Sequence, residues 1–573
     1  MLKKLLVLVL LIFVFCPDMG FSQTSPVPGV TWAVVDTTTP LRIIGGYRNE
    51  NNVSFYEPTT GNLLFSSYYI QESPAERTIT AAVSTDGGAN WTVTRKINEG
   101  VGAELMAYYP VAFGNSSTPI LVYYNRGNAD PNIYSQPIMA TDLLGWGGGL
   151  WDNLAVDTHG TADSLLDHRY HSMTIAPDNP DLWIIGGVSY EPGEYLCLYR
   201  STNAGVTWSK QIKVATNIKA DSLQSNYVWD WSGSTPGLAV NAGPNNKVYG
   251  VFQAEMESEA DIERVVYVTS DDGGLTWTDP TLIPGTENLI FATDHVYKTF
   301  ATLIDAANNY HIFGIGKDTS EVANSYRIWD FRFDGTVWNI NQFGFPQLLN
   351  DGICQPDVGG NPDEEDVMNS PSLGPDGTLY YAYTDVYDTT SSGGSSSLYK
   401  YRIYVMISED NGTTWQGPQW VFEQEGWASE YPVDQTRTAS DKLHFFYRTG
   451  EGGYNTPKQA NYMAVPTQGI KDLISSIDNP SVTHVPESHK LFQNYPNPFN
   501  PNTNIRFNLK EKAHVKLTIF NLLGQKVATL IDKEMIAGEK GITWYPKDVP
   551  SGTYFYRLQA GDFSEVKEMV FIK

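Results

Sequence analysis

The sequence predicts an all-β protein, a β-propeller of seven, or alternatively six, four-stranded blades followed by a small C-terminal β-sandwich. Three observations support this fold class. Aromatic residues make up 13% of the 573 residues, glycine occurs 50 times and charged residues reach only 18%, which is typical of aromatic-rich strands joined by many turns. A short turn motif occurs four times, and a strand-turn-strand segment recurs about every 63 residues.

The turn motif runs over eight residues from a serine to a tryptophan, between two alternating apolar segments. An Asp or Asn at its third position can accept hydrogen bonds from backbone N–H groups just ahead, a glycine provides the positive φ of the reversal, and the tryptophan folds back over the turn. The copies are Ser84–Trp91, Ser201–Trp208, Ser270–Trp277 and Ser408–Trp415, with Asp86, Asn203, Asp272 and Asp410 as the polar residues and Trp91, Trp208, Trp277 and Trp415 as the apolar plugs.

This motif resembles the Asp-box, or BNR repeat, of the sialidase-like β-propellers. The resemblance implies one supersecondary unit used several times, with the Asp-box between the third and fourth strands of a blade. It gives these residues a structural role and assigns no chemistry.

Each repeating unit opens with a strand, an Asx-type turn and a second strand. A weak first opener lies near Pro58, and the last unit lacks an outer strand after residues 459–465, which Thr31 to Val35 are placed to supply. Seven such units make a propeller, whose radial repetition leaves short, protected edges. Six blades remain if the weak first unit is not a full blade. The other openers begin at Pro110, Met173, Pro236, Thr299, Pro371 and Pro432, so successive units are 63, 63, 63, 72 and 61 residues apart.

The chain divides into four segments. Residues 1–22 have the pattern of a secretory signal peptide, with Lys3 and Lys4 before an apolar run and a small residue, Ser22, at the cleavage site. The apolar run is shorter than the roughly 20 residues of a transmembrane helix, so no transmembrane anchor is predicted. Residues 23–466 form the propeller, the polar residues 467–490 form an irregular linker, and residues 491–573 form a separate β domain.

The C-terminal segment has short alternating stretches separated by Gly and Pro, which predicts a β-sandwich of about seven strands. Its segments 495–501 (YPNPFNP), 515–527 (VKLTIFNLLGQKV) and 551–561 (SGTYFYRLQAG) make it similar to the type A C-terminal sorting domain of the type IX secretion system. The resemblance implies that the signal peptide directs passage through the inner membrane and that the outer-membrane type IX machinery recognises the tail. The protein is then secreted or held at the outer cell surface, released or anchored. The alternative is an immunoglobulin-like binding module, because a fold alone does not fix function.

Charge and cysteine content limit the partners and the covalent links. A net charge of −26 and a pI near 4.7 argue against nucleic acid and anionic membranes as partners. Cys197 and Cys354 remain after the signal peptide, and a single pair leaves open whether they form a disulfide or two buried thiols.

Candidate ligand residues lie just before the openers, on loops that lead from the outer strand of one blade to the inner strand of the next. Such loops gather around the channel on the face opposite to the Asp-boxes, where carboxylates can ligate a hard cation or bond sugar hydroxyls. The competing interpretation is that acidic residues in an acidic chain favour exposed loops. The channel-mouth residues are Glu104, Asp167, His168, Arg169, Asp230, Asp294, His295, Asp366, Glu430 and Tyr431.

The catalytic residues stay unknown at this stage. Sialidases hold a substrate carboxylate with three arginines and use a Tyr–Glu nucleophile pair with an Asp acid/base, outside the usual two-carboxylate scheme. Their Arg-Ile-Pro motif has a partial counterpart in Arg42-Ile43-Ile44, without the proline, and no motif places Arg169, Arg437 and Arg448 in a site. The sequence therefore favours a non-enzyme, with a glycoside hydrolase as the alternative.

Neither a metal site nor a cofactor is predicted. The acidic run 363–366 could hold Ca²⁺, but it lacks the spacing and glycine of an EF-hand loop, so a solvated charge run is favoured. Tryptophans expected in long inter-blade loops can stack on sugar rings or simply anchor their loops. They are Trp146, Trp151, Trp229, Trp231 and Trp427.

These features predict a secreted or cell-surface sialidase-like propeller, exported by type IX secretion, that binds a glycan or another extracellular polymer. One alternative is a sialidase-like glycoside hydrolase, or a lyase, acting at the channel-mouth face. A hydrolase requires two carboxylates roughly 5 to 9.5 Å apart in one pocket. The other alternative is a structural or adhesion protein with a filled channel.

Overall fold

The structure is a computed structural model. It describes segments distributed along the chain from residue 14 to residue 572. The described residues are 14–15, 22–36, 53–70, 77–98, 105–127, 136–156, 168–189, 195–209, 212–214, 238–256, 259–286, 289–291, 300–318, 326–344, 370–391, 398–424, 434–449, 459–476, 488–494, 497–500, 503–535, 538–546 and 549–572.

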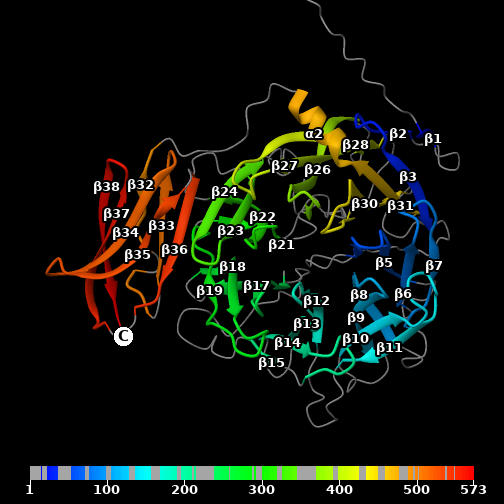
Figure 1. The fold of residues 1–573 in the computed structure, drawn as a ribbon, viewed down its shortest axis with the longest axis horizontal. Helices are drawn as coiled ribbons and strands as arrows, with labels where there is room; N and C mark the ends of the chain where they lie inside the picture. Colours follow the sequence, from blue (N-terminus) through cyan, green and yellow to red (C-terminus); the bar gives the residue numbers. More distant parts are fainter. Residues whose placement is uncertain are drawn as a thin grey trace, which may run out of the picture.

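Within these residues, the part of the chain that precedes the C-terminal domain forms seven antiparallel sheets, each built on four strands. Figure 1 shows the sheets arranged about a common centre. In chain order they contain β4 (Ser54–Tyr56), β5 (Leu63–Ile70), β6 (Arg77–Ser84) and β7 (Thr92–Thr94); β8 (Leu105–Gly114), β9 (Pro119–Gly127), β10 (Gln136–Asp142) and β11 (Trp151–Ala155); β12 (His168–Ala176), β13 (Asn179–Ser189), β14 (Tyr195–Ser201) and β15 (Ile212–Lys213); β16 (Leu238–Ala242), β17 (Val248–Met256), β18 (Glu259–Ser270) and β19 (Thr281–Leu282); β21 (Phe300–Ile304), β22 (Tyr310–Asp318), β23 (Tyr326–Phe333) and β24 (Trp338–Gly344); β25 (Ser370–Leu373), β26 (Leu379–Ser391), β27 (Leu398–Ser408) and β28 (Gln416–Gln424); and β29 (Asp434–Gln435), β30 (Lys442–Thr449), β31 (Gln459–Pro466) and β3 (Thr31–Asp36).

The seventh sheet takes its outer strand from the start of the chain. Strand β3 pairs antiparallel with β31, and Thr31 lies opposite Ala464. This confirms the pairing expected from the missing outer strand of the last unit. Two further short strands extend the sixth sheet, because β2 (Ser22–Thr24) pairs with β28 and β1 (Val14–Phe15) pairs with β2, while β20 (Leu289–Phe291) pairs with β22 in the fifth sheet.

The hydrophobic core lies between neighbouring sheets rather than inside any one of them. Strand β16 illustrates the reason, since all five of its residues are buried, as expected for a strand covered on both faces. Its Leu238 and Val240 pack with Ile184 and Leu198 of the third sheet. Apolar side chains on both faces of each sheet are thereby removed from water, which is the main source of stability in this arrangement.

Each Asp-box turn is held by hydrogen bonds from its own polar side chains. The Ser270 Oγ accepts from the Gly274 N–H (2.9 Å), and the Asp272 Oδ1 accepts from the Thr276 N–H (2.9 Å). The Trp277 indole N–H then donates to the Gly274 carbonyl (3.1 Å). The serine and Asp or Asn bonds recur in the turns at 84–91, 201–208 and 408–415.

The Asp-boxes also contact the preceding sheet. Gly88 has a positive φ of 93°, and a Cβ there would overlap the ring of Tyr462 on β31. Gly412 has a φ of 75°, and a Cβ there would lie 2.5 Å from Asp330 Oδ2 on β23. Glycine is therefore required at these positions both for the turn and for the close approach of one sheet to the next.

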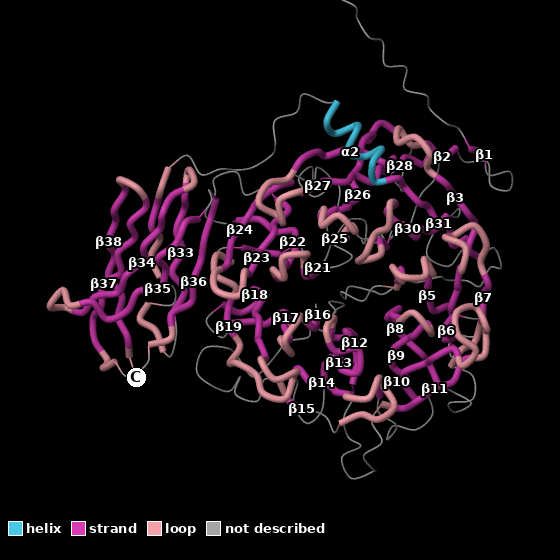
Figure 2. The backbone as a smooth tube through the Cα atoms, viewed as in Figure 1, coloured by secondary structure: helices cyan, strands magenta, loops and turns pink. Residues whose placement is uncertain are grey.

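The segment predicted as an irregular linker, 467–490, begins with a helix, which corrects that part of the prediction. Helix α2 (Thr467–Ser476) is the cyan segment in Figure 2. Its buried Ile470 and Ile474 pack with Val27 and Leu443 in one apolar cluster. The i, i+4 spacing of these two isoleucines gives the helix an apolar face, and burial of that face overrides the polar character of the segment.

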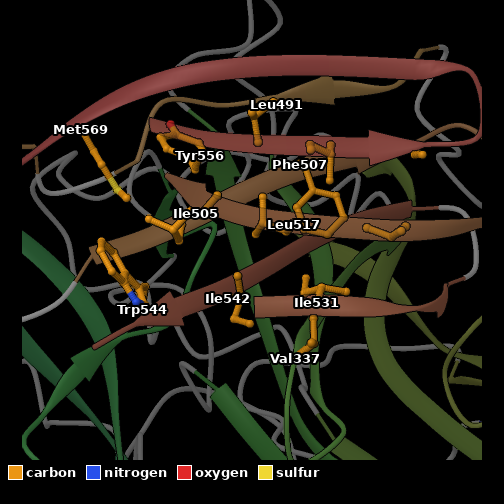
Figure 3. Close-up of a cluster of buried hydrophobic side chains, with 14 of the residues drawn as sticks. Val337, Leu491, Ile505, Phe507, Leu517, Ile531, Ile542, Trp544, Tyr556 and Met569 are labelled. Carbon is orange, nitrogen blue, oxygen red and sulfur yellow. The ribbon is translucent and has the colours of Figure 1, made fainter. Parts of the chain in front are cut away.

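The C-terminal domain has two facing sheets around one core. Figure 3 shows apolar side chains from both sheets meeting between them, among them Phe507, Leu517 and Tyr556. In β37 the buried residues alternate with half-buried ones, as expected when one face of a sheet packs on the core. One sheet contains β32 (Lys490–Leu491), β33 (Thr503–Leu509) and β36 (Gly538–Trp544), and the other contains β34 (Ala513–Asn521), β35 (Lys526–Met535), β37 (Gly552–Ala560) and β38 (Phe563–Phe571).

Candidate functional site

Most of the predicted channel-mouth residues lie outside the described part of the chain. Within it, His168 and Arg169 begin strand β12, the first strand of the third sheet. The residues outside the described ranges are Glu104, Asp167, Asp230, Asp294, His295, Asp366, Glu430 and Tyr431, together with Trp229, Trp231, Trp427 and Cys354.

Two of the tryptophans expected in inter-blade loops lie elsewhere, which corrects that expectation. Trp146 lies in the turn between β10 and β11, and Trp151 is the first residue of β11. Asp142 organises this turn by accepting hydrogen bonds from the N–H groups of Gly149 (2.6 Å) and Leu150 (3.2 Å). The turn occupies the position of an Asp-box but lacks the serine-to-tryptophan spacing, so the sequence pattern does not predict it.

The first strands of neighbouring sheets are joined by hydrogen bonds of short polar side chains, to backbone or to another side chain. The Ser172 Oγ accepts from the Val240 N–H (3.2 Å), and the Thr174 Oγ1 accepts from the Ala242 N–H (3.0 Å), which ties β12 to β16. The Thr302 hydroxyl donates to Asn241 Oδ1 (2.5 Å), which ties β16 to β21. Short polar side chains thus replace the main-chain ladder where one sheet meets the next.

The first and seventh sheets are linked in the same way. The Ser54 hydroxyl on β4 donates to Asp434 Oδ2 on β29 (2.6 Å), and both residues are buried. The Thr438 hydroxyl donates to the Tyr56 carbonyl (3.1 Å). Thr438 also forms a parallel bridge with Leu373 of β25. The first strands therefore run in the same direction where sheets six and seven meet.

A cavity of about 190 Å³ lies among these first strands. Its wall is mainly apolar, and its polar groups come from one arginine, one asparagine and several hydroxyls. The residues that define its character are Phe55, Phe113, Met173, Asn241, Thr302 and Arg437. A mostly apolar wall with a few fixed polar groups is the usual composition of a small-molecule site.

The cavity lies near the C-terminal ends of the first strands. Its lining residues come from the C-terminal parts of the first strands, for example 111–113 of β8 and 302–304 of β21. These strand ends lead into the turn between first and second strands, which contacts the turn between third and fourth strands: the Trp146 indole N–H donates to the Asn115 carbonyl (2.9 Å). The carboxylates predicted for the channel mouth lie outside the described residues.

A buried histidine lies between two carboxylates in the fifth sheet, and the sequence analysis missed it. His311 Nδ1 is 2.8 Å from Asp330 Oδ1, and Nε2 is 3.2 Å from Asp305 Oδ2, with all three side chains buried. Burial by itself lowers the pKa of His311, but the charges of Asp330 and Asp305 and the hydrogen bonds to them outweigh burial and raise it. The group is fully buried, and its residues are not among those that line the cavity. A histidine within an apolar strand segment gave no distinctive signal.

A second buried histidine behaves in the opposite way. His444 on β30 bonds the Tyr462 hydroxyl through Nδ1 (2.7 Å) and the Ser440 hydroxyl through Nε2 (3.1 Å). Burial, with a smaller effect of the positive charge of Lys442, lowers the pKa of His444 to about 3. Its two hydrogen-bond partners are hydroxyl groups that carry no charge. This ring therefore stays uncharged at neutral pH.

Cys197 lies on β14, where it is buried and its thiol donates to the Gly187 carbonyl (3.3 Å). The described part of the chain holds no group of three or more His, Cys, Asp or Glu side chains arranged to bind a metal ion.

Comparison with solved structures gives similarity at low identity. An ulvan lyase of polysaccharide lyase family PL25, bound to a GlcA(1-4)Rha3S unit, is 12% identical over 75% of this chain and 99% of that chain, with a TM-score of 0.45. The GH93 α-L-arabinofuranosidase of Fusarium graminearum in complex with arabinobiose is 11% identical over 73% and 96%, with a TM-score of 0.34. A Hadza microbial sialidase is 12% identical over 69% and 75%, with a TM-score of 0.32. The search of curated proteins found no match.

The C-terminal domain is identified directly by sequence. Residues 493–573 match the secretion system C-terminal sorting domain, within the predicted range 491–573. Among the described residues, no helix combines the length and the apolar character needed to cross a membrane. The chain carries a type IX sorting domain and is exported to the cell surface or the extracellular space.

Proposed function

We propose that this exported protein is a closed seven-bladed propeller that binds a glycan or another extracellular polymer through its central channel. The observation that carries the proposal is the cavity enclosed by the first strands of several sheets, with Arg437, Asn241 and Thr302 in its wall. Export places the protein where extracellular polymers are found, and its negative charge fits a neutral polymer or one bridged by cations better than a polyanion.

The wall chemistry suits a sugar. Phe55, Phe113 and Met173 provide apolar surface for the C–H face of a ring. Asn241 and Thr302 are held in place by their mutual hydrogen bond and provide oriented polar groups for hydroxyls. The guanidinium of Arg437 adds donors in a rigid fork, which matches a carboxylate or a pair of hydroxyl oxygens.

The volume of the cavity limits the size of the ligand that it can hold. Drug-sized ligands occupy sites of roughly 300 to 1,000 Å³. The cavity of about 190 Å³ is smaller, so it takes a single sugar unit or a chain end rather than several units.

The test uses the full chain from residue 23, screened on a glycan array and with chromogenic glycosides, with and without Ca²⁺. The Arg437→Ala variant removes the cationic group of the cavity. Asp230→Asn and Asp294→Asn remove two carboxylates that the sequence predicts at the channel mouth. Arg557→Ala is the matched control, since Arg557 stacks on Phe520 in the C-terminal domain.

Binding without turnover that is lost in Arg437→Ala and kept in Arg557→Ala supports the proposal. Turnover that disappears in Asp230→Asn or Asp294→Asn makes the protein a glycoside hydrolase or lyase and contradicts a pure binding role. Silence of the intact chain in both assays favours a structural or adhesion protein.

A further inference from the structure

The C-terminal domain is paired to the outer edge of the fifth sheet. Strand β36 runs antiparallel to β24, with Trp338 opposite Gly541, Asn339 opposite Lys540 and Ile340 opposite Glu539. Its other edge pairs with β33. One continuous sheet therefore passes from the seven-sheet region into the C-terminal domain, as Figure 1 shows where β36 lies beside β24.

Both sides of the contact are shaped for close approach. Gly541 faces Pro284, and a Cβ at this glycine would lie 2.5 Å from the Pro284 Cβ. Gly285 has a φ of 94°, its carbonyl accepts a hydrogen bond from Arg506 Nη1 (3.0 Å), and a Cβ there would overlap Ile340. Larger residues at either glycine are excluded, so the backbone of β36 fits this edge and the loop beside it.

A side chain of the fifth sheet enters the core of the C-terminal domain. Val337 lies in the turn between β23 and β24, is fully buried, and belongs to the same apolar cluster as Ile531 and Ile542 (Figure 3). The adjacent Asp334 shapes the turn by accepting from the Val337 N–H (2.8 Å) and forms an ion pair with Lys533 (Oδ2 to Nζ, 3.0 Å). In four of the other sheets an Asp-box occupies this turn.

We propose that the outer edge of the fifth sheet is a docking site for the sorting domain of the same chain, so that the tail is carried as a docked unit rather than as a free appendage. The edge strand supplies main-chain bonds, Val337 supplies an apolar anchor, and the Asp334–Lys533 pair and Arg506 fix the register. Docking also covers two strand edges that otherwise invite aggregation. This proposal is independent of the glycan-binding proposal.

Docking determines which face of the tail stays available to the export machinery. Strands β37 and β38 lie on the side away from the seven sheets in Figure 1. The turn between β34 and β35 exposes Leu522 and Leu523 at 68% and 82% of their surface. An export partner meets these regions first, while the β36 edge is already occupied.

The test is zero-length carbodiimide cross-linking of the intact chain, read by mass spectrometry. The expected product joins Lys533 to Asp334 across the interface. Lys516 and Asp532 lie 2.7 Å apart within the C-terminal domain and provide the internal standard, with comparable exposure. Mixing ¹⁴N and ¹⁵N chains separates docking in one chain from exchange between two copies.

Gly541→Val is expected to abolish the Lys533–Asp334 product, because its side chain overlaps Pro284, and to keep the Lys516–Asp532 product. Thr529→Val, which places the same side chain on an exposed position of β35, is the control and keeps both products. If Gly541→Val also loses the Lys516–Asp532 product, Val337→Asn is used instead, because it alters the fifth sheet and leaves the sequence of the C-terminal domain unchanged. It is expected to abolish the Lys533–Asp334 product and keep the Lys516–Asp532 product. A missing interdomain product in the parent chain, mixed-isotope products, or its survival in both Gly541→Val and Val337→Asn overturns the proposal.

Discussion

His311 Nδ1 lies 2.8 Å from Asp330 Oδ1 inside the fifth sheet, and both side chains are fully buried. Asp305 bonds the opposite ring nitrogen at 3.2 Å, so the imidazole bridges two carboxylates. Because removing one partner leaves buried charge uncompensated, His311→Phe is expected to lower the free energy of unfolding by about 3–5 kcal/mol. Urea unfolding of the variant and the parent chain measures this loss.

The pH dependence of the same variant tests the charge on the ring. The pKa of His311 is raised above its ordinary value of 6.5, so its contribution is complete below that pH and is lost as the pH rises through the raised value. His311→Phe is expected to remove this loss of stability at alkaline pH. His444→Phe is the control, since the pKa of His444 is lowered to about 3 and the ring is neutral above pH 7. Equal alkaline profiles for His311→Phe and the parent would contradict a charged bridge.

Asp272 carries the Asp-box turn of the fourth sheet. Its carboxylate accepts from the Leu275 and Thr276 N–H groups and from the Thr276 hydroxyl, so Asp272→Ala is expected to cost about 1–2 kcal/mol. Slight burial raises its pKa, but these bonds outweigh burial and lower it to about 2. The stabilisation is therefore present above pH 3.8 and is lost as the pH falls toward 2. Asp271→Ala removes an exposed ion pair with Lys247 and is expected to cost under about 1 kcal/mol; a larger loss there than in Asp272→Ala would refute the assignment.

Gly412 separates the cost of a positive φ from the cost of a tight contact. Gly335 has a φ of 87° and open space around its Cβ position, so Gly335→Ala measures the backbone term, about 1–2 kcal/mol. Gly412→Ala adds overlap of the new Cβ with Asp330 and His311. It is therefore expected to lower the free energy of unfolding by about 1–3 kcal/mol more than Gly335→Ala does. Thermal unfolding of the two variants gives the difference, and equal losses would show that the Asp-box does not press on the preceding sheet.

Helix α2 belongs to the seven-sheet region rather than to a linker. Ile470 is fully buried against that region, so Ile470→Ala is expected to cost about 2–5 kcal/mol. Ser475→Ala, on the exposed side of the helix, serves as the matched control and is expected to stay within about 0.5 kcal/mol of the parent. Chains ending at residue 466 and at residue 476 provide a second measurement, and equal melting temperatures would contradict this boundary.

The features predicted from sequence are those encoded locally. An Asp-box brings its serine, its acid and its glycine together within eight residues, so the same bonds form wherever the pattern occurs. The pairing of Thr31 to Val35 was foreseen because the repeat left one strand missing. The turn at Asp142 was missed because it reaches the same geometry with different spacing.

The remaining features depend on contacts between distant segments. In the sequence, Asn241 and Thr302 are indistinguishable from other strand residues. They come together in the wall of the cavity only because the fourth and fifth sheets pack side by side. The pairing of β24 with β36 joins residues about 200 positions apart, and no repeat in the sequence predicts it. Helix α2 was not predicted because its apolar face consists of only Ile470, Leu473 and Ile474 within a polar stretch.

The seventh sheet can be completed only late in synthesis, because its outer strand β3 is made long before its partner β31. Thr31 pairs with Ala464, so more than 400 residues must follow β3 before its partner exists. At roughly 5–20 residues per second, the ribosome needs about 20–90 s to supply them. During that interval the backbone groups of β3 that bond β31 have no partner strand, so the seventh sheet is completed only after synthesis of the other six.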